Sequence, residues 1–391
     1  MSTVIKMHVG IINCNPPQHV YESLNKYLLK GVQVELMERP GVREAMFYQP
    51  LGDGRVRCNL CHKRCVIVPG AYGACGVRYN KDGKLYTLVY GLLTAANPDP
   101  IEKKPLMHFN PGACVFSIST VGCNFYCRFC QNWVLSQSRR DRLYGEPFEP
   151  SEVVEKALEY GCQGISYTYN EPTIFYEFMY DTAKLAKKHG LFNTMVTNGY
   201  MTEEAVREIG PYMDAATVDF KGGGNVEFYR KFIGVWDPSP IYSTILEMKR
   251  QGWWIEITNL VVPVYGDKEE DVIKLSRWIV ENLGEETPFH LLRFHPEYLM
   301  SNLPPTPVET LEKLAKLARE QGLKHVYIGN VWGHPLENTY CPRCGNLVVE
   351  REGFYITKWN LGEGFTCPRC GYKLNFRGSY WGGSGRRFFY F

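Results

Sequence analysis

The sequence lacks a membrane-spanning segment, a secretory signal and a strong net charge. No stretch of about 20 consecutive apolar residues occurs in the chain, so a membrane-spanning helix is not expected. The N-terminus has no basic segment followed by an apolar core, which a secretory signal would need. The formal net charge is only +3, too small to indicate a surface built for nucleic acid. We therefore expect a cytoplasmic protein without membrane partners.

Cysteine, by contrast, is plentiful: the chain has 14. Because cytoplasmic thiols are kept reduced, short Cys-x-x-Cys spacings there indicate metal or redox chemistry more often than disulfides. Most of the cysteines fall into three sets, one of three and two of four. Cys14, Cys114 and Cys162 stand apart, and we expect them to behave as small apolar residues.

The set of three is Cys123, Cys127 and Cys130, spaced C-x3-C-x2-C among aromatic residues. Three thiolates so close in sequence can hold one [4Fe–4S] cube and leave its fourth iron without a protein ligand. That iron can then bind a small molecule directly. A simple electron carrier would need a fourth cysteine, and none lies close to Cys130. A chance trio of buried cysteines or a partial zinc knuckle would give the same spacing, although structural zinc takes four ligands.

A second set, Cys58, Cys61, Cys65 and Cys75, lies nearer the N-terminus among glycines that allow tight turns. Four thiolates suit either zinc or a four-cysteine iron–sulfur cluster, and the sequence does not decide between them. A pair of disulfides is also compatible with this set. His62 is expected to be exposed rather than a ligand, since four thiolates already complete the site.

The third set forms two matching Cys-Pro-Arg-Cys-Gly knuckles near the C-terminus, built from Cys341, Cys344, Cys367 and Cys370. Strand-like residues at 347–349 and 355–356 separate the knuckles. This pattern predicts a zinc ribbon, in which four thiolates bind one structural ion. Basic residues lie in and after the ribbon among aromatics: Arg343, Arg369, Arg377, Arg386 and Arg387. We expect a lid or docking module with a solvated basic face rather than a nucleic-acid site.

Between these cysteine-rich ends, strand and helix patterns alternate. Strands are expected at 115–120, 164–169, 191–196, 215–220, 254–262, 289–294 and 325–329. Helices are expected at 151–160, 174–189, 202–209, 241–251, 269–282 and 307–321. Polar residues follow several strand ends, which indicates a parallel α/β barrel with its active site at that end. A doubly wound sheet is the competing fold, but it would place a glycine-rich turn where this chain has Cys123 and its neighbours.

The chain thus divides into four expected parts: an N-terminal extension (1–42), a cysteine-rich N-terminal module (43–111), a barrel (112–335) and a C-terminal zinc ribbon (336–391). The extension has no chemical motif, and a helix is predicted at 20–36. The polar, proline-punctuated stretch 99–109 is expected to be a loop. Its Glu102, Lys103, Lys104 and His108 would face either the substrate or solvent.

Several motifs together resemble the radical SAM superfamily. They lie at 58–61 with 75–78, 99–106, 123–133, 169–172, 218–221, and 329–330 leading into 338–342. Within the superfamily they resemble the pyruvate formate-lyase-activating-enzyme-like branch and, more closely, the radical SAM member of the AmmeMemoRadiSam system. The resemblance covers residues 43 to 370 and implies a partial (β/α)6 TIM-like barrel.

The resemblance also implies an activity. In this family S-adenosylmethionine (SAM) chelates the open iron of the cluster held by Cys123, Cys127 and Cys130. One electron from the cluster then cleaves SAM to a 5′-deoxyadenosyl radical. An external donor such as ferredoxin or flavodoxin would supply that electron.

Contacts to the methionyl part of SAM are implied at two strand ends. Tyr169, Asn170 and Glu171 occupy the place of the family's usual Gly-Gly-Glu, and Glu171 would accept a bond from the methionyl ammonium. Asp219 and Lys221 resemble an Asp-x-Lys pair of glycyl-radical activases, in which the lysine meets the SAM carboxylate. Lys221 is therefore an expected catalytic residue.

Contacts to the nucleoside part are implied elsewhere. Phe129 and Val262 would flank the adenine, and His295 would approach the ribose. Thr197 and Asn198 would lie near the methionyl or ribose groups. Capping of strand ends is the competing role for Thr197, Asn198 and His295.

The substrate stays open at this stage. Activation of a glycyl-radical enzyme and modification of a small molecule or RNA are both compatible with the motifs. The family implies Memo-like and Ammecr-like proteins as partners. A hypothesis of another class is a metal-stapled nucleic-acid-binding protein that uses the ribbon and the basic tail, but the nearly neutral net charge argues against it.

Overall fold

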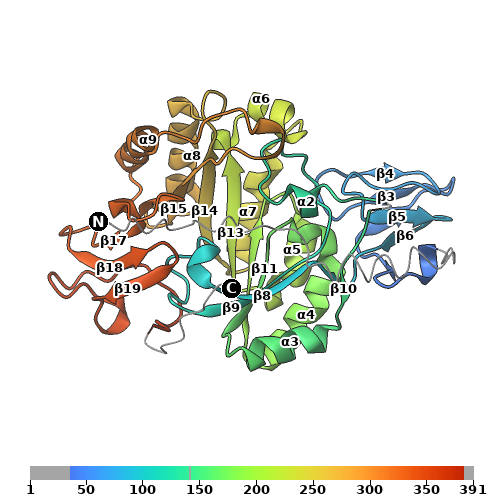
Figure 1. The fold of residues 1–391 in the computed structure, drawn as a ribbon, viewed down its shortest axis with the longest axis horizontal. Coiled ribbons are helices and arrows are strands. Elements are labelled where there is room, and N and C mark those ends of the chain that lie inside the picture. The colour runs from blue at the N-terminus through green and yellow to red at the C-terminus, as the bar shows by residue number, and fades with distance from the viewer. Residues whose placement is uncertain (1–35, 141, 383–391) are drawn as a thin grey trace, which may run out of the picture.

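A curved eight-stranded sheet lies at the centre of the computed structural model, which describes residues 36–140 and 142–382 (Figure 1). Cys14, Arg386, Arg387 and nearly all of the helix expected at 20–36 lie outside the described residues. The strand order is β16 (Val326–Gly329), β15 (Phe289–Arg293), β14 (Trp254–Val261), β13 (Ala215–Lys221), β12 (Phe192–Thr197), β11 (Gly164–Tyr167), β9 (Cys114–Ser119) and β8 (Ala95–Pro100). Neighbouring strands from β9 to β16 are parallel, and only β8 pairs antiparallel.

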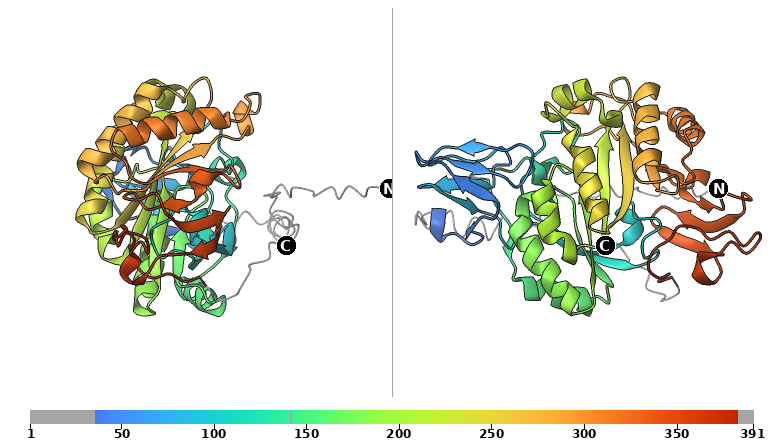
Figure 2. Two further views of the ribbon diagram at one scale, coloured as in Figure 1. Left: turned by 90° about the vertical axis from the view of Figure 1, so that its left-hand side faces the viewer. Right: turned by 180° about the vertical axis from the view of Figure 1, so that it is seen from behind.

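Helices connect the consecutive parallel strands from β11 to β16 and also β9 to β11. They are α3 (Pro150–Glu159), α4 (Tyr176–Lys188), α5 (Glu203–Ile209), α7 (Pro240–Arg250), α8 (Glu269–Asn282) and α9 (Val308–Glu320). These long helices gather on one side of the sheet (Figure 2). Their apolar faces pack on the sheet, as the helical spacing of buried residues requires. The expected partial (β/α)6 barrel is therefore confirmed.

Shorter elements fill the connections. They are α2 (Trp133–Ser136), α6 (Val226–Phe228), a π-turn at Tyr229–Ile233, and 3-10 turns at Leu36–Glu38, Ile101–Lys103, Pro172–Phe175, Gly210–Tyr212, Gly222–Gly224, Tyr298–Met300, Pro335–Glu337 and Glu363–Phe365. Within the described residues, no helix has both the length and the apolar character needed to cross a membrane.

The stretch 99–113, called the plug below, differs from the solvated loop that its polarity suggested. Its first residues end β8, and its apolar side chains pack against the sheet. Asp99, Glu102, Lys104 and His108 are all buried. These polar side chains are tolerated because they find partners: Lys104 donates to Asp99 at 2.7 Å, and the His108 ring bonds the Tyr327 hydroxyl at 2.5 Å.

The cysteine-rich module and the ribbon lie on opposite sides of the barrel (Figures 1 and 2). The module's strands are β1 (Arg43–Glu44), β2 (Tyr48–Pro50), β3 (Val56–Cys58), β4 (Val66–Ile67), β5 (Arg78–Lys81) and β6 (Lys84–Thr87), in two antiparallel sheets. A separate pair joins β7 (Leu92–Leu93) to β10 (Glu146–Pro147). The ribbon's strands are β17 (Thr339–Tyr340), β18 (Leu347–Glu352) and β19 (Tyr355–Trp359).

A buried ion pair fixes the module to the barrel. Arg78, in β5, donates to both carboxylate oxygens of Glu177, in α4, at 2.8 Å. Both side chains are almost wholly buried, and the Met46 amide donates to the same carboxylate at 2.7 Å. The attraction of Glu177, working against the cost of burial, holds the pKa of Arg78 above its usual value.

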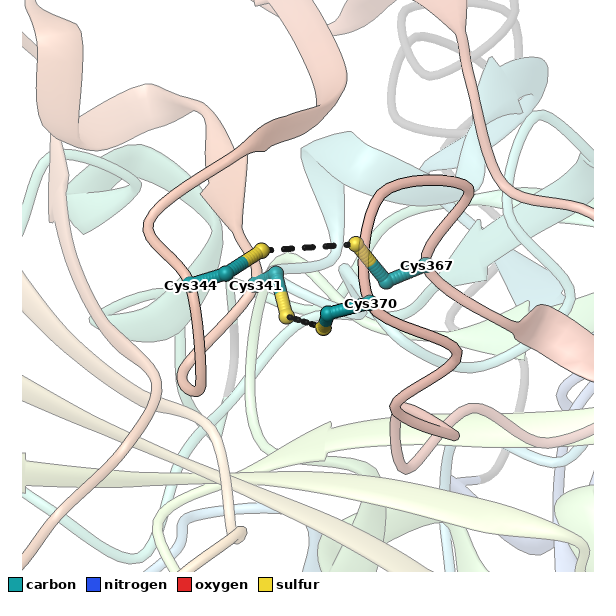
Figure 3. Close-up of side chains that lie close together, drawn as sticks. All are labelled: Cys341, Cys344, Cys367 and Cys370. Carbon is teal, nitrogen blue, oxygen red and sulfur yellow. Dashed lines mark hydrogen bonds between the residues drawn. The ribbon is translucent and has the colours of Figure 1, made fainter.

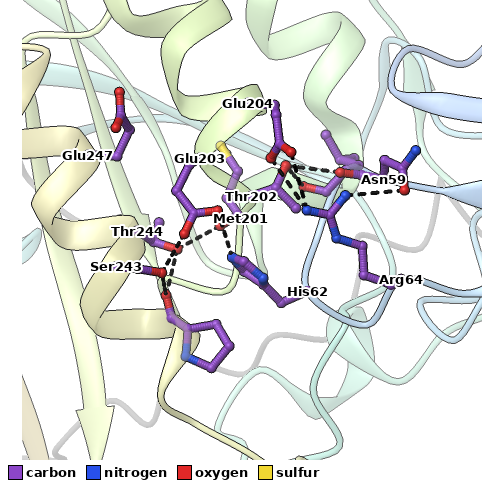
Figure 4. Close-up of polar contacts among 12 residues, drawn as sticks. Asn59, His62, Arg64, Met201, Thr202, Glu203, Glu204, Ser243, Thr244 and Glu247 are labelled. Carbon is purple, nitrogen blue, oxygen red and sulfur yellow. Dashed lines mark hydrogen bonds and ion pairs between the residues drawn. The ribbon is translucent and has the colours of Figure 1, made fainter.

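The first cysteine knuckle docks on the start of α5 and on the residue before it (Figure 4). Thr202 donates to the Asn59 carbonyl at 2.9 Å, and Arg64 lies 3.4 Å from Glu204. His62 was expected to be exposed, but its side chain is only 14% exposed and faces Glu203 at 3.5 Å. Burial lowers its pKa. The knuckle therefore forms part of the domain interface.

The ribbon docks on the plug through buried polar groups. Arg351, in β18, donates to the Met107 carbonyl at 3.1 Å and to Thr339 at 2.8 Å. His108 stacks on Phe376 with ring centres 4.0 Å apart. The plug therefore joins the ribbon to the inside of the barrel.

Cys114 and Cys162 correct another expectation. They are joined by a disulfide, whereas the sequence suggested two unrelated small apolar residues. Cys114 begins β9 and Cys162 precedes β11, the neighbouring parallel strand. Two cysteines that are far apart in sequence thus meet at the start of adjacent strands.

Removing the carboxylate of the buried ion pair should be strongly destabilising. We expect Glu177→Ala to lower the free energy of unfolding by about 3–5 kcal/mol, because it leaves the Arg78 charge buried and unpaired. Urea-induced unfolding measures the loss. Glu269→Ala is the matched control, since Glu269 pairs with Lys313 in the open, and it should cost less than about 1 kcal/mol. Equal losses for the two variants would contradict this account.

Candidate active site and metal centres

The loop that holds Cys123, Cys127 and Cys130 follows β9 at the carboxyl end of the barrel. It begins at Gly122, whose φ of +95° favours glycine. A Cβ atom at Gly122 would come within 2.6 Å of Val77 and 3.1 Å of the Cys75 carbonyl, so there is no room for a side chain. The loop therefore packs directly against the N-terminal cysteine module.

The three thiols of this loop lie close to one another in a largely buried site. Burial raises the pKa of Cys127 to about 12, although nearby Lys221 opposes the rise. Burial, followed by the neighbouring charges of Glu171 and Cys127, raises the pKa of Cys123. Thiols in this setting become thiolates only when a strong cationic partner binds them. The donor set therefore fits an iron–sulfur cluster.

Two asparagines tie the Tyr169–Glu171 segment to both ends of the cysteine loop. Asn170 donates to the Gly122 carbonyl at 2.9 Å, just before Cys123. Asn132, just after the last cysteine, donates to the Tyr169 carbonyl at 2.8 Å. Asn132 lies in the motif but was not singled out from the sequence, because its partner is a backbone atom on another strand end.

Tyr169 has a φ of +65°, the left-handed region that glycine adopts readily. The family's Gly-Gly-Glu is absent from this sequence, yet the backbone here keeps a glycine-like conformation. The Tyr169 hydroxyl donates to Asp99 of the plug, and Lys104 lies 4.5 Å from the ring centre. The plug therefore holds the Tyr169 side chain in place through Asp99 and Lys104.

Glu171 is buried, with 2% of its surface exposed, and accepts four hydrogen bonds. Its Oε1 accepts from the Thr173 amide and hydroxyl, at 3.0 and 2.6 Å, and from the Thr197 hydroxyl at 2.8 Å. Among the described residues, the Asn198 amide alone donates to its Oε2, at 2.7 Å. Burial raises its pKa. Because a carboxylate oxygen can accept two bonds, Oε2 still has capacity for a ligand ammonium.

Thr197 and Asn198 thus donate hydrogen bonds to Glu171. This is the capping role expected of residues at a strand end. Asn198 also donates to the Asn124 side chain at 2.7 Å, directly after Cys123. Direct contact of either residue with SAM stays a prediction. Asn124 was not singled out from the sequence either.

Asp219 and Lys221 lie two apart on β13, so their side chains share one face. Lys221 Nζ is 3.7 Å from the Asp219 carboxylate and donates to the Asp219 carbonyl at 3.1 Å. The Asp219 carboxylate also accepts from Thr258. Lys221 is close enough to Cys127 and Cys130 to oppose the rise in their pKa values. The pair therefore faces the cysteine loop, as the sequence suggested.

The residues predicted to contact the nucleoside lie in different settings. Phe129 is buried, 5.7 Å from the Phe228 ring centre, and Val262 is buried after β14. His295 is exposed, and its ring lies 3.0 Å from the Pro296 carbonyl. The adenine and ribose contacts stay predictions.

The ribbon cysteines form a tight site (Figure 3). The Sγ atoms of Cys341 and Cys370 are 3.6 Å apart, and those of Cys344 and Cys367 are 3.7 Å apart. All four lie within 4.8 Å of one another. Tetrahedral Zn–S bonds of about 2.3 Å place sulfurs ~3.8 Å apart, so the spacing fits a single zinc ion.

The N-terminal cysteines line one cavity together. Cys58, Cys61, Cys65 and Cys75 are all free thiols and share its wall with Lys63. Among the described residues, the ribbon cysteines are the only group of three or more potential ligands compact enough to hold a metal ion as they stand. The N-terminal cysteines do not form such a compact group.

Comparisons with known proteins agree with this geometry. Residues 117–279 match the Radical SAM superfamily. The chain is 47% identical over 335 residues to an uncharacterized protein of Methanocaldococcus jannaschii, covering 85% of this chain and 99% of that protein. It belongs to the radical SAM superfamily. It is also 23% identical over 226 residues to the pyruvate formate-lyase 1-activating enzyme of Escherichia coli, covering 53% of this chain and 89% of that enzyme.

A solved domain of a pyruvate-formate lyase-activating enzyme from Bacteroides vulgatus aligns at 17% identity with a TM-score of 0.38, over 43% of this chain and 99% of that domain. From the family match and the Escherichia coli relative, the protein is a radical SAM enzyme with likeness to pyruvate formate-lyase-activating enzymes, as the motifs predicted. Membership implies a [4Fe–4S] cluster, SAM, an electron donor and a substrate.

Changing Glu171 to glutamine should weaken SAM binding. The amide group of Glu171→Gln faces backbone and hydroxyl donors, so at least one buried donor loses its acceptor. We expect a loss of about 1–3 kcal/mol in stability and at least tenfold weaker SAM binding, measured by equilibrium dialysis of the reconstituted protein. Glu208→Gln, on the exposed side of α5, is the control and should bind SAM normally. Unchanged affinity in Glu171→Gln would contradict the assigned role.

Proposed function

We propose that this protein cleaves SAM reductively at a [4Fe–4S] cluster held by Cys123, Cys127 and Cys130, and that the resulting 5′-deoxyadenosyl radical attacks a substrate at the barrel mouth. The observation that carries the proposal is the convergence of a three-cysteine loop with Glu171 and Lys221 at one end of the barrel. When bound, the cluster supplies the electron that breaks the sulfonium bond.

The chain's own charges suit the two ends of the methionyl group. Glu171 Oε2 accepts a bond from the ammonium, because its position is fixed by Asn198 and its second lone pair is available. Lys221, beside Cys127 and Cys130, meets the carboxylate. Asp219 keeps the lysine side chain oriented through the 3.7 Å contact. A negative side chain near Cys123 and a positive one near Cys127 and Cys130 thus give SAM one orientation.

Buried apolar side chains limit water around the reaction. Phe129 and Val262 supply apolar surface for the adenine. His295, on the exposed rim after β15, approaches the ribose from the solvent side. Shielding matters because a primary carbon radical abstracts hydrogen from any C–H or S–H group that reaches it from solution.

Activation of a glycyl-radical enzyme is the reaction we favour. The likeness to pyruvate formate-lyase 1-activating enzyme supports it. Modification of a small molecule or RNA is the second candidate. In either case ferredoxin or flavodoxin would donate electrons, and Memo-like and Ammecr-like proteins are the proposed partners. Candidate substrates deuterated at carbon distinguish these reactions, since the true one transfers deuterium to 5′-deoxyadenosine.

We propose zinc in the ribbon, with a structural role. The sulfur spacing supports a single ion, and the docking of Arg351 and His108 links the ribbon to the plug. Loss of the ion should therefore loosen the structure of the barrel at the plug as well as that of the ribbon.

Cys127→Ala should abolish SAM cleavage. With dithionite and SAM, the reconstituted wild type should release 5′-deoxyadenosine, measured by liquid chromatography with mass spectrometry. Cys127→Ala should release none, because two thiolates do not hold the cluster. The double change Cys114→Ala with Cys162→Ala is the control, since this disulfide pair belongs to none of the three cysteine sets and its joint removal leaves no new free thiol, and it should cleave SAM normally. A wild type that binds SAM without cleaving it would overturn the proposed function.

Removing a ribbon thiolate should loosen the plug. Cys344→Ser should lose the zinc and increase amide hydrogen exchange both in the ribbon and at residues 107–110, because backbone groups in this stretch bond to Arg351 and Arg377 of the ribbon. Arg343→Ala in the same knuckle should keep the zinc and the protection. If exchange rises in the ribbon alone, the plug does not depend on the metal.

A further inference from the structure

The cavity beside Cys58, Cys61, Cys65 and Cys75 is a site that neither the barrel chemistry nor the ribbon explains. The four thiols come from two knuckles separated by β4, and they converge on one buried space. All four are free, so the pair of disulfides considered from the sequence is not formed.

The spacing of these sulfurs bears on the choice that the sequence left open, between a single zinc ion and an iron–sulfur cluster. A single zinc ion would draw four sulfurs to within ~3.8 Å of one another. The ribbon cysteines show that spacing. Among the described residues, neither the N-terminal cysteines nor Cys123, Cys127 and Cys130 form a comparably compact group. A cube whose four iron corners each take one thiolate requires wider spacing than a single ion does.

Two buried donors at the cavity wall point to a ligand inside it. Asn124 Nδ2 and Arg78 Nε have no hydrogen-bond partner among the described residues, although the two residues are 0% and 2% exposed. Unsatisfied buried N–H groups are costly. The inorganic sulfides and thiolates of a cluster accept hydrogen bonds of this kind, and Arg78 and Lys63 supply positive charge for its thiolates.

This cavity also adjoins the SAM site. Asn124 lines it and directly follows Cys123. Tyr126 and Arg139 both donate to the Ala74 carbonyl, at 2.5 and 2.7 Å, and Arg139 also donates to the Phe125 carbonyl at 2.9 Å. The residue before Cys75 is thus bonded to the loop that holds the first cluster.

We propose that Cys58, Cys61, Cys65 and Cys75 hold a second [4Fe–4S] cluster, fully ligated by protein and therefore closed to SAM. Asn124 and Arg78 donate hydrogen bonds to it. The proposal deepens the proposed function, because it places a second one-electron centre next to the first. Its own evidence is the sulfur spacing and the unpartnered donors, which do not depend on SAM cleavage.

The metal content of the full-length wild type tests the proposal. After anaerobic reconstitution, we expect about eight iron atoms, eight acid-labile sulfides and one zinc per chain. About four irons and two zincs would overturn the proposal in favour of zinc. About four irons and one zinc would overturn it in favour of a metal-free site. Neither result depends on a variant that has to fold.

A variant without the first cluster isolates the second. The triple change Cys123→Ala, Cys127→Ala and Cys130→Ala should keep about four irons and, after reduction, an electron paramagnetic resonance signal that SAM does not alter. The matched change Cys58→Ala with Cys75→Ala should keep the signal that SAM does alter. A folded triple variant without iron would overturn the proposal. Wild type with eight irons but no SAM cleavage would overturn only the proposed function.

Discussion

The hydrogen bonds of the Tyr169–Glu171 segment are the constraint on which the rest of the site depends. Asn170 holds the start of the cysteine loop, and Asn132 holds its end to the Tyr169 carbonyl. Glu171 joins the next strand end through Thr197 and Asn198. Because Glu171, Thr197 and Asn198 are buried, breaking one of their bonds leaves a polar atom without a partner. The loop, the carboxylate and the neighbouring strand end are therefore positioned as one unit.

Buried charged side chains connect this segment to the plug and the ribbon, and connect the barrel to the cysteine-rich module. The plug reaches Tyr169 through Asp99, and the ribbon reaches the plug through Arg351. On the opposite side, Arg78 joins the module to Glu177 of α4. In each case a charge leaves water only where a charged or hydrogen-bonding partner lies beside it. The three cysteine-bearing parts are thus linked by paired polar groups as well as by apolar packing.

The sequence predicted most of the barrel because its strands and helices alternate with clear periods, and the bounds of α8 agree to the residue. It also predicted the compact ribbon cysteine group, whereas the SAM roles of the strand-end residues Glu171, Asp219 and Lys221 stay predictions. It failed where distant partners decide the outcome. The plug reads as polar, yet Lys104 and Asp99 neutralise each other in the interior. The Cys114–Cys162 bond likewise depends on strand neighbours that sequence spacing does not reveal.

The central claim is that the three-cysteine loop leaves one iron open for SAM. Electron–nuclear double resonance on the reduced protein, mixed with SAM carrying 15N in its amine and 17O in its carboxylate, tests this claim most directly. The account predicts hyperfine coupling of both nuclei to the cluster in the wild type. Coupling should be absent when Cys127 is alanine. A reduced wild-type cluster that shows no coupling to either nucleus would contradict the account.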